Sequence, residues 1–282
     1  MIASLRPAWR ASPLLVVGMA IVVLIAVVAA LAPWLAPYDP KATTGDSFES
    51  PSGSHWLGTN DAGADLLSRL IWGARNTLIV AGGATVVVLV IGIAVGVTAG
   101  LRGGMVDVVL MRLVDVFLAL PLLPLLIFIA ALAGPSQRLS ILMIGLFAWP
   151  QTARLTRSQT LSLRARGYVD SARGFGAGPV HVMRRHLLPA LGPIIAGNLV
   201  YVAGLAVTIE AGLAFIGLAD PVAVSWGAEL NRALDHSQTY SGSVWLWWLL
   251  PPGLAVSLAI LGFTFVGVGM EPRFNPRWSS VR

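Results

Sequence analysis

Residues 168–189, YVDSARGFGAGPVHVMRRHLLP, form a basic, helix-compatible stretch between two strongly apolar runs. The flanking runs, 139–153 and 187–209, could lie in a bilayer, whereas a segment that carries Asp170, Arg173 and two adjacent arginines could not. We therefore expect a short amphipathic helix at the membrane surface. Such a helix is suited to docking into a soluble partner and to passing force to the membrane spans beside it.

The composition indicates a membrane protein. Of 282 residues, 56% are hydrophobic and 11% are charged, and the mean hydropathy is +0.78, whereas a soluble domain carries about 25% charged residues. There is no cysteine, which excludes a disulfide framework and a thiolate nucleophile. The net charge of +6 comes from arginines scattered between apolar runs. That pattern is typical of membrane topology, so no nucleic-acid partner is predicted.

Six apolar runs predict an all-α polytopic membrane protein with about six transmembrane helices. Pro121 and Pro124 are expected to kink the third span, and Pro150 interrupts the fourth. The first run is too long for the apolar part of a signal peptide and is expected to remain as an uncleaved span. The predicted spans are residues 14–31, 78–99, 116–133, 139–153, 187–209 and 244–270.

Charge decides the orientation of these spans. With both termini in the cytoplasm, fourteen arginines lie inside, and only four arginines and Lys41 lie outside. The predicted organisation is an N-terminal tail with the first transmembrane helix (1–36), an extracytoplasmic loop (37–77), a transmembrane core (78–270) with a cytoplasmic coupling helix at about 165–186, and a cytoplasmic C-terminal tail (271–282).

The outside loops hold the acidic residues. Asp61, Asp65 and Trp226 are candidates for the extracytoplasmic face or the pathway, where they would receive a partner or border an entrance; alternatively, these loops only cap the bundle. Glu210, near the outer end of the fifth span, is interpreted either as a hydrogen-bond acceptor for the following turn or as a pathway group. Asp115 is expected to pair with the arginine three residues earlier, Arg112.

Gly92, Gly96 and Gly100 lie on one face of the second span. Small residues at this spacing let two helix backbones approach closely, so these glycines are predicted to pack against another helix. No strand precedes them, which argues against a phosphate-binding loop.

Several catalytic patterns are absent from the sequence. There is no Walker A motif, so any ATPase that drives transport must be another chain. No HExxH or G-x-S-x-G motif occurs, and the four histidines form no ligand pattern. We therefore predict no catalytic residue, no metal site and no cofactor in this chain.

Residues 170–189 resemble the cytoplasmic signature of bacterial ATP-binding-cassette (ABC) importer permeases, EAA-x3-G-x9-I-x-L-P. Asp170-Ser171-Ala172 stands in the place of EAA, Gly176 follows after three residues, and His186-Leu187-Leu188-Pro189 follows after nine more. The spacing is intact, and Asp, Ser and His replace Glu, Ala and Ile.

Other stretches resemble the dipeptide/oligopeptide/nickel branch of that family, in particular its C-type permease subunit. Ala64 replaces an arginine of the family's outside motif, and residues 267–277 keep only a remnant of the usual ending. The stretches that match are His55-Trp56-Leu57-Gly58-Thr59-Asn60, Gly73-Ala74-Arg75, Arg102-Gly103-Gly104, Glu210-Ala211-Gly212-Leu213 and Ser225-Trp226-Gly227.

The resemblance implies a type I ABC importer permease in a bacterial plasma membrane. It would form half of the pathway for di- or oligopeptides, with a second homologous permease, two ATPase subunits that bind ATP and Mg, an extracytoplasmic substrate-binding protein and membrane lipid as partners. The residues that would couple it to the ATPase are Tyr168, Asp170, Ser171, Ala172, Arg173, Gly176, Leu188 and Pro189.

Alternatives to peptides within the family are nickel chelates, haem or another peptide-sized solute. From other classes, a polytopic membrane enzyme would need a catalytic constellation, which is not seen. A secondary transporter would usually show paired intramembrane charges or inverted repeats, and neither is apparent.

Overall fold

The computed structural model describes residues 12–218 and 220–274, and all regular elements in these ranges are helical. This confirms the predicted all-α class. The helices are α1 (Pro13–Ala30), α2 (Ala32–Leu35), α3 (Leu66–Arg102), α4 (Gly104–Ala119), α5 (Leu122–Ala133), α6 (Gln137–Arg164), α7 (Gly167–Gly174), α8 (Pro179–Val182), a π-helical turn (Met183–Leu187), α9 (Leu188–Phe215), α10 (Trp226–Asp235), a 3₁₀ turn (Ser237–Tyr240), α11 (Val244–Trp248) and α12 (Leu250–Phe274).

Four helical stretches of the described chain are long and apolar enough to cross a membrane: Pro13–Ala30, Leu66–Arg102, Met183–Phe215 and Val244–Met270. A fifth is formed if α4 and α5 count as one span, although they meet at an angle of 78°. Pro121 lies at this bend, within the predicted third span. Its backbone is extended, because its ring cannot continue the helix.

The predicted second and fourth spans are parts of longer helices. α3 begins at Leu66, twelve residues before the expected start, because Asp65 caps it by accepting a hydrogen bond from the Ser68 amide. The fourth span, 139–153, is the first half of α6, whose second half carries several arginines. α6 is therefore not among the apolar helices of the previous paragraph.

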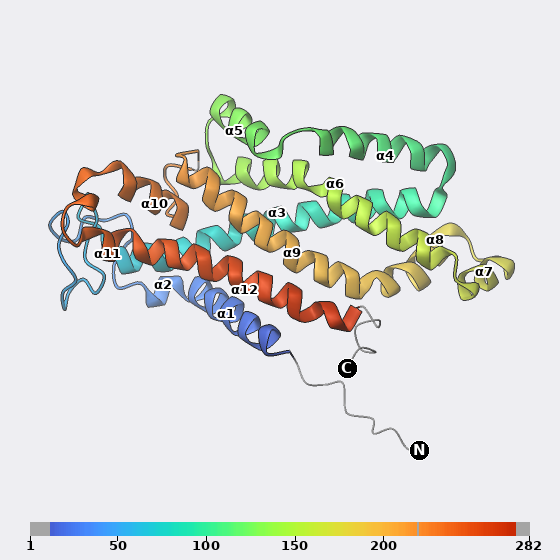
Figure 1. Ribbon diagram of the computed structural model, residues 1–282, viewed down its shortest axis with the longest axis horizontal. Coiled ribbons are helices and arrows are strands. Elements are labelled where there is room, and N and C mark those ends of the chain that lie inside the picture. The colour runs from blue at the N-terminus through green and yellow to red at the C-terminus, as the bar shows by residue number, and fades with distance from the viewer. Residues whose placement is uncertain (1–11, 219, 275–282) are drawn as a thin grey trace, which may run out of the picture.

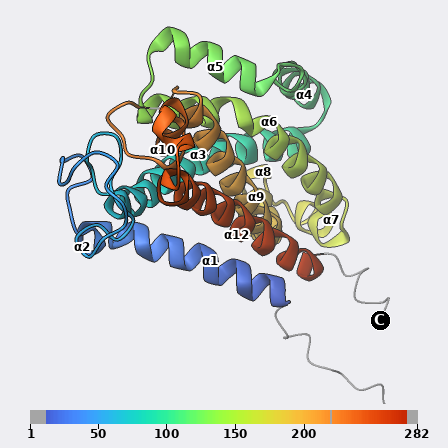
Figure 2. The same cartoon turned by 60° about the vertical axis from the view of Figure 1, so that its left-hand side comes forward.

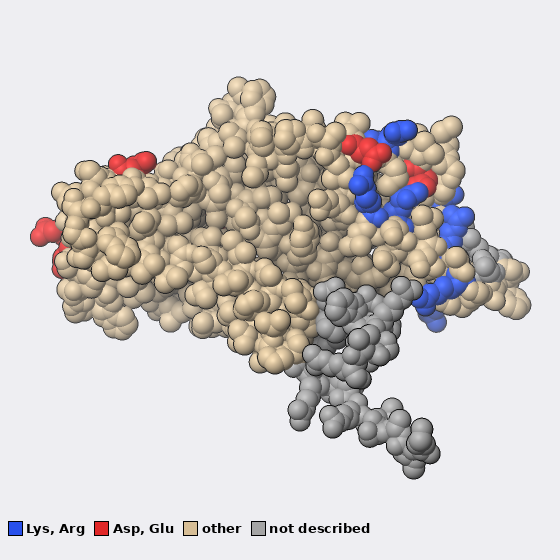
Figure 3. All heavy atoms as spheres, viewed as in Figure 1, with Lys and Arg blue, Asp and Glu red and all other residues tan. Residues whose placement is uncertain are grey.

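The long helices lie side by side along the long axis of the molecule (Figure 1). The start of α1 and the end of α12 are the ends of these helices that point toward the α7 side of the molecule. The loops that precede α3 and α12 lie at the opposite end, and the view in Figure 2 agrees. On the face shown in Figure 3, arginine side chains gather at the α7 end. We call this end the inner end and the opposite one the outer end.

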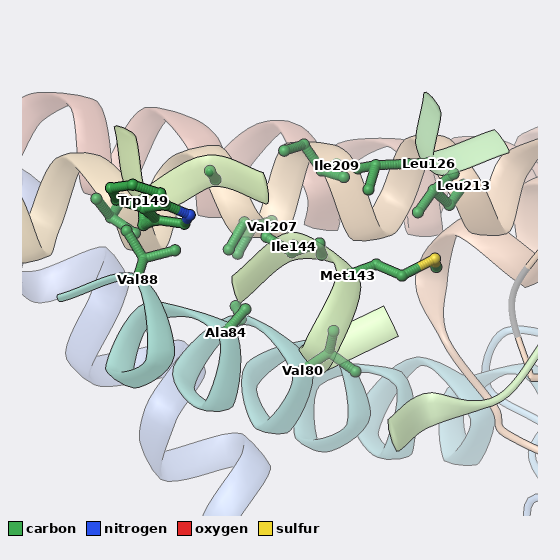
Figure 4. Close-up of a cluster of buried hydrophobic side chains, with 14 of the residues drawn as sticks. Val80, Ala84, Val88, Leu126, Met143, Ile144, Trp149, Val207, Ile209 and Leu213 are labelled. Carbon is green, nitrogen blue, oxygen red and sulfur yellow. The ribbon is translucent and has the colours of Figure 1, made fainter. Parts of the chain in front are cut away.

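The core lies between α3, α6 and α9 (Figure 4). α3 contributes Val80, Ala84 and Val88, and these side chains meet Ile144 of α6 and Val207 of α9. Each of the five is at most 3% exposed. In a bilayer such packing is stabilised by close van der Waals contact between the helices rather than by removal of apolar surface from water, and these three helices form the body to which the surface elements attach.

The three predicted packing glycines of α3 all face α6. A Cβ atom at Gly92 would lie 2.6 Å from the Thr152 side chain, and one at Gly100 would lie 2.8 Å from Thr160 Cβ. At Gly96 it would lie 2.4 Å from the Ala153 carbonyl oxygen. The two backbones therefore approach too closely for any side chain.

Candidate functional site

The segment that links α6 to α9 forms a compact projection at the inner end of the bundle (Figure 1). We call residues 165–187 the docking segment. Val169 of α7, Val182 of α8 and Leu187 of the π-helical turn are fully buried. They pack in one apolar cluster with side chains of α3, α6 and α9, namely Val97, Leu163 and Leu191. The docking segment is therefore anchored to the three core helices.

The turn after α7 requires glycine for its backbone conformation. Gly176 has a φ of 86°, and nothing lies within 4 Å of a Cβ built there. The Ala177 amide donates to the Ala172 carbonyl at 3.0 Å, and the Phe175 amide donates to the Ser171 carbonyl at 3.0 Å. This six-residue closure with glycine at the left-handed position is the Schellman arrangement that ends helices.

The docking segment presents aromatic surface. Phe175 is 93% exposed, Tyr168 is also exposed, and the Tyr168 ring centroid lies 6.0 Å from that of His186. Exposed aromatic side chains on a rigid support are common anchors of protein–protein interfaces. Phe175 was not among the predicted coupling residues, although its place directly before the glycine turn could have indicated it.

The other predicted coupling residues lie in the same segment. Ser171 is exposed and Ala172 is half-buried, while Leu188 and Pro189 begin α9, half-buried and exposed respectively. The side chains of Asp170 and Arg173 lie outside the described part of the structure.

Polar contacts hold α6 to its neighbours above the docking segment. Arg164 Nη1 donates to the carbonyl oxygens of Gly100 and Leu101, each at 3.1 Å, and so satisfies the end of α3. Arg157 binds Asp107 of α4 through two hydrogen bonds. Movement of the docking segment would therefore be transmitted to α3 and α4 through α6.

The expected pair between Asp115 and Arg112 is wrong. Asp115 instead accepts a hydrogen bond from Arg154 Nη2 at 2.7 Å. α4 lies alongside α6, so the carboxylate reaches a guanidinium of the neighbouring helix rather than one on its own surface.

At the outer end, two residues predicted for an exposed face are buried. Asp65 is 1% exposed and binds His55 Nδ1 at 2.9 Å as well as capping α3. Trp226 is 3% exposed, and its Nε1 donates to the Leu70 carbonyl. Burial favours the alternative in which these loops only cap the bundle, because in this conformation neither side chain can meet a soluble partner. Asp61 is partly exposed and lies 3.6 Å from Arg232.

Glu210 is also buried at the outer end of the bundle. It is 5% exposed, and the Thr77 hydroxyl donates to its Oε2 at 3.0 Å. Glu210 is thus a hydrogen-bond acceptor that joins α9 to α3, although its donor lies in α3 rather than in the following turn.

A further polar centre at the outer end was missed. Glu229 of α10 accepts from Arg69 Nε at 2.5 Å and from Trp248 Nε1 at 2.8 Å, and Arg69 also donates to the Pro40 carbonyl. These residues come from four separate parts of the chain, so no local sequence pattern could have paired them.

The comparisons with known proteins agree with this geometry. Residues 92–280 match the family described as the inner membrane component of binding-protein-dependent transport systems. The chain belongs to this family. Residues 7–51 also match the N-terminal transmembrane domain of oligopeptide transport permease C. This permease is therefore a transport subunit of an ABC importer and a multi-pass inner membrane protein, and its family implies ATPase partners.

Two relatives of the permease illustrate its place in the family. A protein of Brucella suis biovar 1 named as a peptide permease is 36% identical over 246 residues, which cover 86% of this chain and 80% of the relative. A protein of Escherichia coli K12 named as a permease of the D,D-dipeptide transport system, DdpC, is 33% identical over 271 residues, covering 95% and 89%.

The fold also matches a solved structure, the MetNI methionine ABC transporter in an inward-facing conformation. The TM-score is 0.56 at 20% identity, and the match covers 72% of the permease and 97% of the MetNI chain. The predicted type I ABC importer permease fold is confirmed.

Proposed function

We propose that this permease forms half of the translocation pathway of an importer for di- and oligopeptides. A second homologous permease supplies the other half, and an extracytoplasmic binding protein delivers the peptide. Two ATPase subunits bind and hydrolyse ATP with Mg, and this chain has no ATPase site of its own. The names of the relatives support the peptide substrate, and the charge bias of the loops supports cytoplasmic termini.

The docking segment is the observation that carries this proposal. Its side chains Val169, Val182 and Leu187 are fully buried against the core helices, whereas Phe175 is exposed. We assign the exposed face around Tyr168, Ser171 and Phe175 to a groove on the ATPase. Because the buried side chains pack against α3, α6 and α9, closure of the ATPase pair would rock these helices between inward-open and outward-open states.

Replacement of Gly176 tests the coupling role. Gly176→Val forces a β-branched residue into a left-handed conformation, at a cost on the order of 1–3 kcal/mol. Gly178→Val is the matched control, because Gly178 has equally open surroundings and no positive φ. We expect Gly176→Val to lower the amount of ATPase that copurifies from membranes by about tenfold, with unchanged membrane insertion. Normal copurification and normal transport in Gly176→Val would refute the proposal for this turn.

Uptake assays test the substrate. The assembled importer in proteoliposomes, supplied with ATP and binding protein, is expected to accumulate di- and tripeptides in preference to nickel chelates or haem. Accumulation of a nickel chelate or haem without peptide uptake would contradict the peptide assignment but leave the ATPase coupling intact.

A further inference from the structure

A groove runs between α6, α9 and α12 on the surface of the bundle. Its volume is about 860 Å³, within the range of about 300–1,000 Å³ that is usual for sites of small ligands. Its walls are largely apolar, with Ile194 and Leu205 of α9 and Phe263 of α12 among the lining residues. α9 and α12 belong to stretches that are long and apolar enough to cross a membrane, and α6 contributes Gln151 and Leu155 near the end of its apolar half.

Polar side chains interrupt this apolar wall. Gln151 is exposed and Tyr201 is 56% exposed, and neither side chain has a hydrogen-bond partner among the described residues. Asn198 also lines the groove, and its amide nitrogen donates to Thr152 Oγ1 at 2.9 Å. Thr208 is exposed on the same wall, and its hydroxyl donates a hydrogen bond to the Gly204 carbonyl, one turn earlier in α9.

Contact with lipid hydrocarbon is unfavourable for these groups, because an amide or phenol that lacks a hydrogen-bond partner raises the free energy in an apolar medium. The wall also differs from the exposed side of α3, where Ile79, Val86 and Val90 present only apolar surface. The groove is therefore suited to water or to a polar solute. Among the residues whose side chains the structure describes, its lining contains no Asp, Glu, Lys, Arg or His.

We propose that this groove is the part of the pathway that contacts the main chain of the peptide, and that it passes peptides with little regard to side-chain charge. The inference rests on the proposed peptide importer. Neutral amide, phenol and hydroxyl groups can both donate to and accept from peptide N–H and C=O groups. Because the described lining residues carry no fixed charge, cationic and anionic side chains are neither selected nor rejected by them.

The rate at which an introduced cysteine is modified tests whether water enters the groove. The chain has no native cysteine, so Thr208→Cys can be compared with Val86→Cys, which lies on the apolar side of α3 and is 60% exposed in the isolated chain. A water-soluble methanethiosulfonate attacks only the thiolate, which needs water to form. In the assembled complex, we expect Thr208→Cys to react at least about tenfold faster than Val86→Cys. Equally slow reactions would mean that lipid or a helix of the second permease covers the groove, and would overturn the inference.

A charge placed in the groove tests the claim of charge indifference. We expect the wild-type complex, at saturating binding protein, to import Ala-Ala-Ala, Ala-Lys-Ala and Ala-Glu-Ala at rates within about threefold of one another. Thr208→Glu should raise the uptake ratio of Ala-Lys-Ala to Ala-Glu-Ala at least about fivefold, whereas the uncharged Thr208→Gln should leave the ratio unchanged.

The outcomes separate the two proposals. Peptide uptake with an unchanged ratio in Thr208→Glu would overturn the groove inference alone. Absence of peptide uptake by the wild-type complex would overturn the proposed function together with the inference that depends on it.

Discussion

Replacement of Gly96 by alanine tests the close contact between α3 and α6. A Cβ atom at this position would lie 2.4 Å from the Ala153 carbonyl oxygen, 2.8 Å from Thr156 Cβ and 2.9 Å from the Arg157 amide nitrogen. Non-bonded heavy atoms favour separations of about 3.5–4.0 Å. Two of these neighbours are backbone atoms that no rotamer change can move, so the helices must separate by roughly 1 Å.

The expected magnitude follows from two opposing effects. Overpacking of a well-packed contact costs about 1–3 kcal/mol, while alanine gains about 1 kcal/mol over glycine inside a helix. Gly96→Ala should therefore lower the free energy of unfolding by up to about 2 kcal/mol. Gly82→Ala, on the same helix, is the matched control. Nothing lies within 4 Å of a Cβ at Gly82, so this variant should gain up to about 1 kcal/mol.

Thermal stability of the detergent-solubilised permease measures both variants. The monodisperse fraction is followed by size-exclusion chromatography after heating. With a shift of about 2–4 °C for each kcal/mol, Gly96→Ala should melt below the wild type and Gly82→Ala at or above it. Equal melting temperatures for the two variants, or a more stable Gly96→Ala, would refute the assignment of Gly96 to a backbone contact.

Three further predictions follow from the cap, the docking segment and the topology. Asp65→Ala should lower the free energy of unfolding by about 1–2 kcal/mol through loss of the α3 cap, whereas Asp65→Asn should retain most of it in the same melting assay. Phe175→Ala should leave the melting temperature unchanged and lower ATPase copurification at least about tenfold, as for an interface anchor; full copurification would exclude that role. A cysteine at Ser47 should react with an impermeant reagent from outside, and one at Ser279, beyond the described residues, should not; the reverse labelling would invert the proposed orientation.

Local features of the sequence were sufficient for the class of protein and for the docking segment. Apolar runs long enough for a bilayer predict helices, because backbone polar groups in lipid must be satisfied within the helix itself. The turn at Gly176 could also be predicted, since a glycine between an amphipathic helix and Pro179 indicates a left-handed helix end. The spacing of Gly92, Gly96 and Gly100 likewise predicted a contact face, although not which helix would occupy it.

The choice of partners across the fold was decided only by tertiary structure. Asp115 binds Arg154 rather than Arg112 because α4 lies against α6, and Asp65 and Trp226 are buried because the outer loop folds over the start of α3. Arg69 and Glu229, 160 residues apart, meet for the same reason. Sequence periodicity fixes which face of a helix is polar, but the neighbour of that face depends on how the helices are rotated and how closely they pack, which their combined side-chain volumes determine.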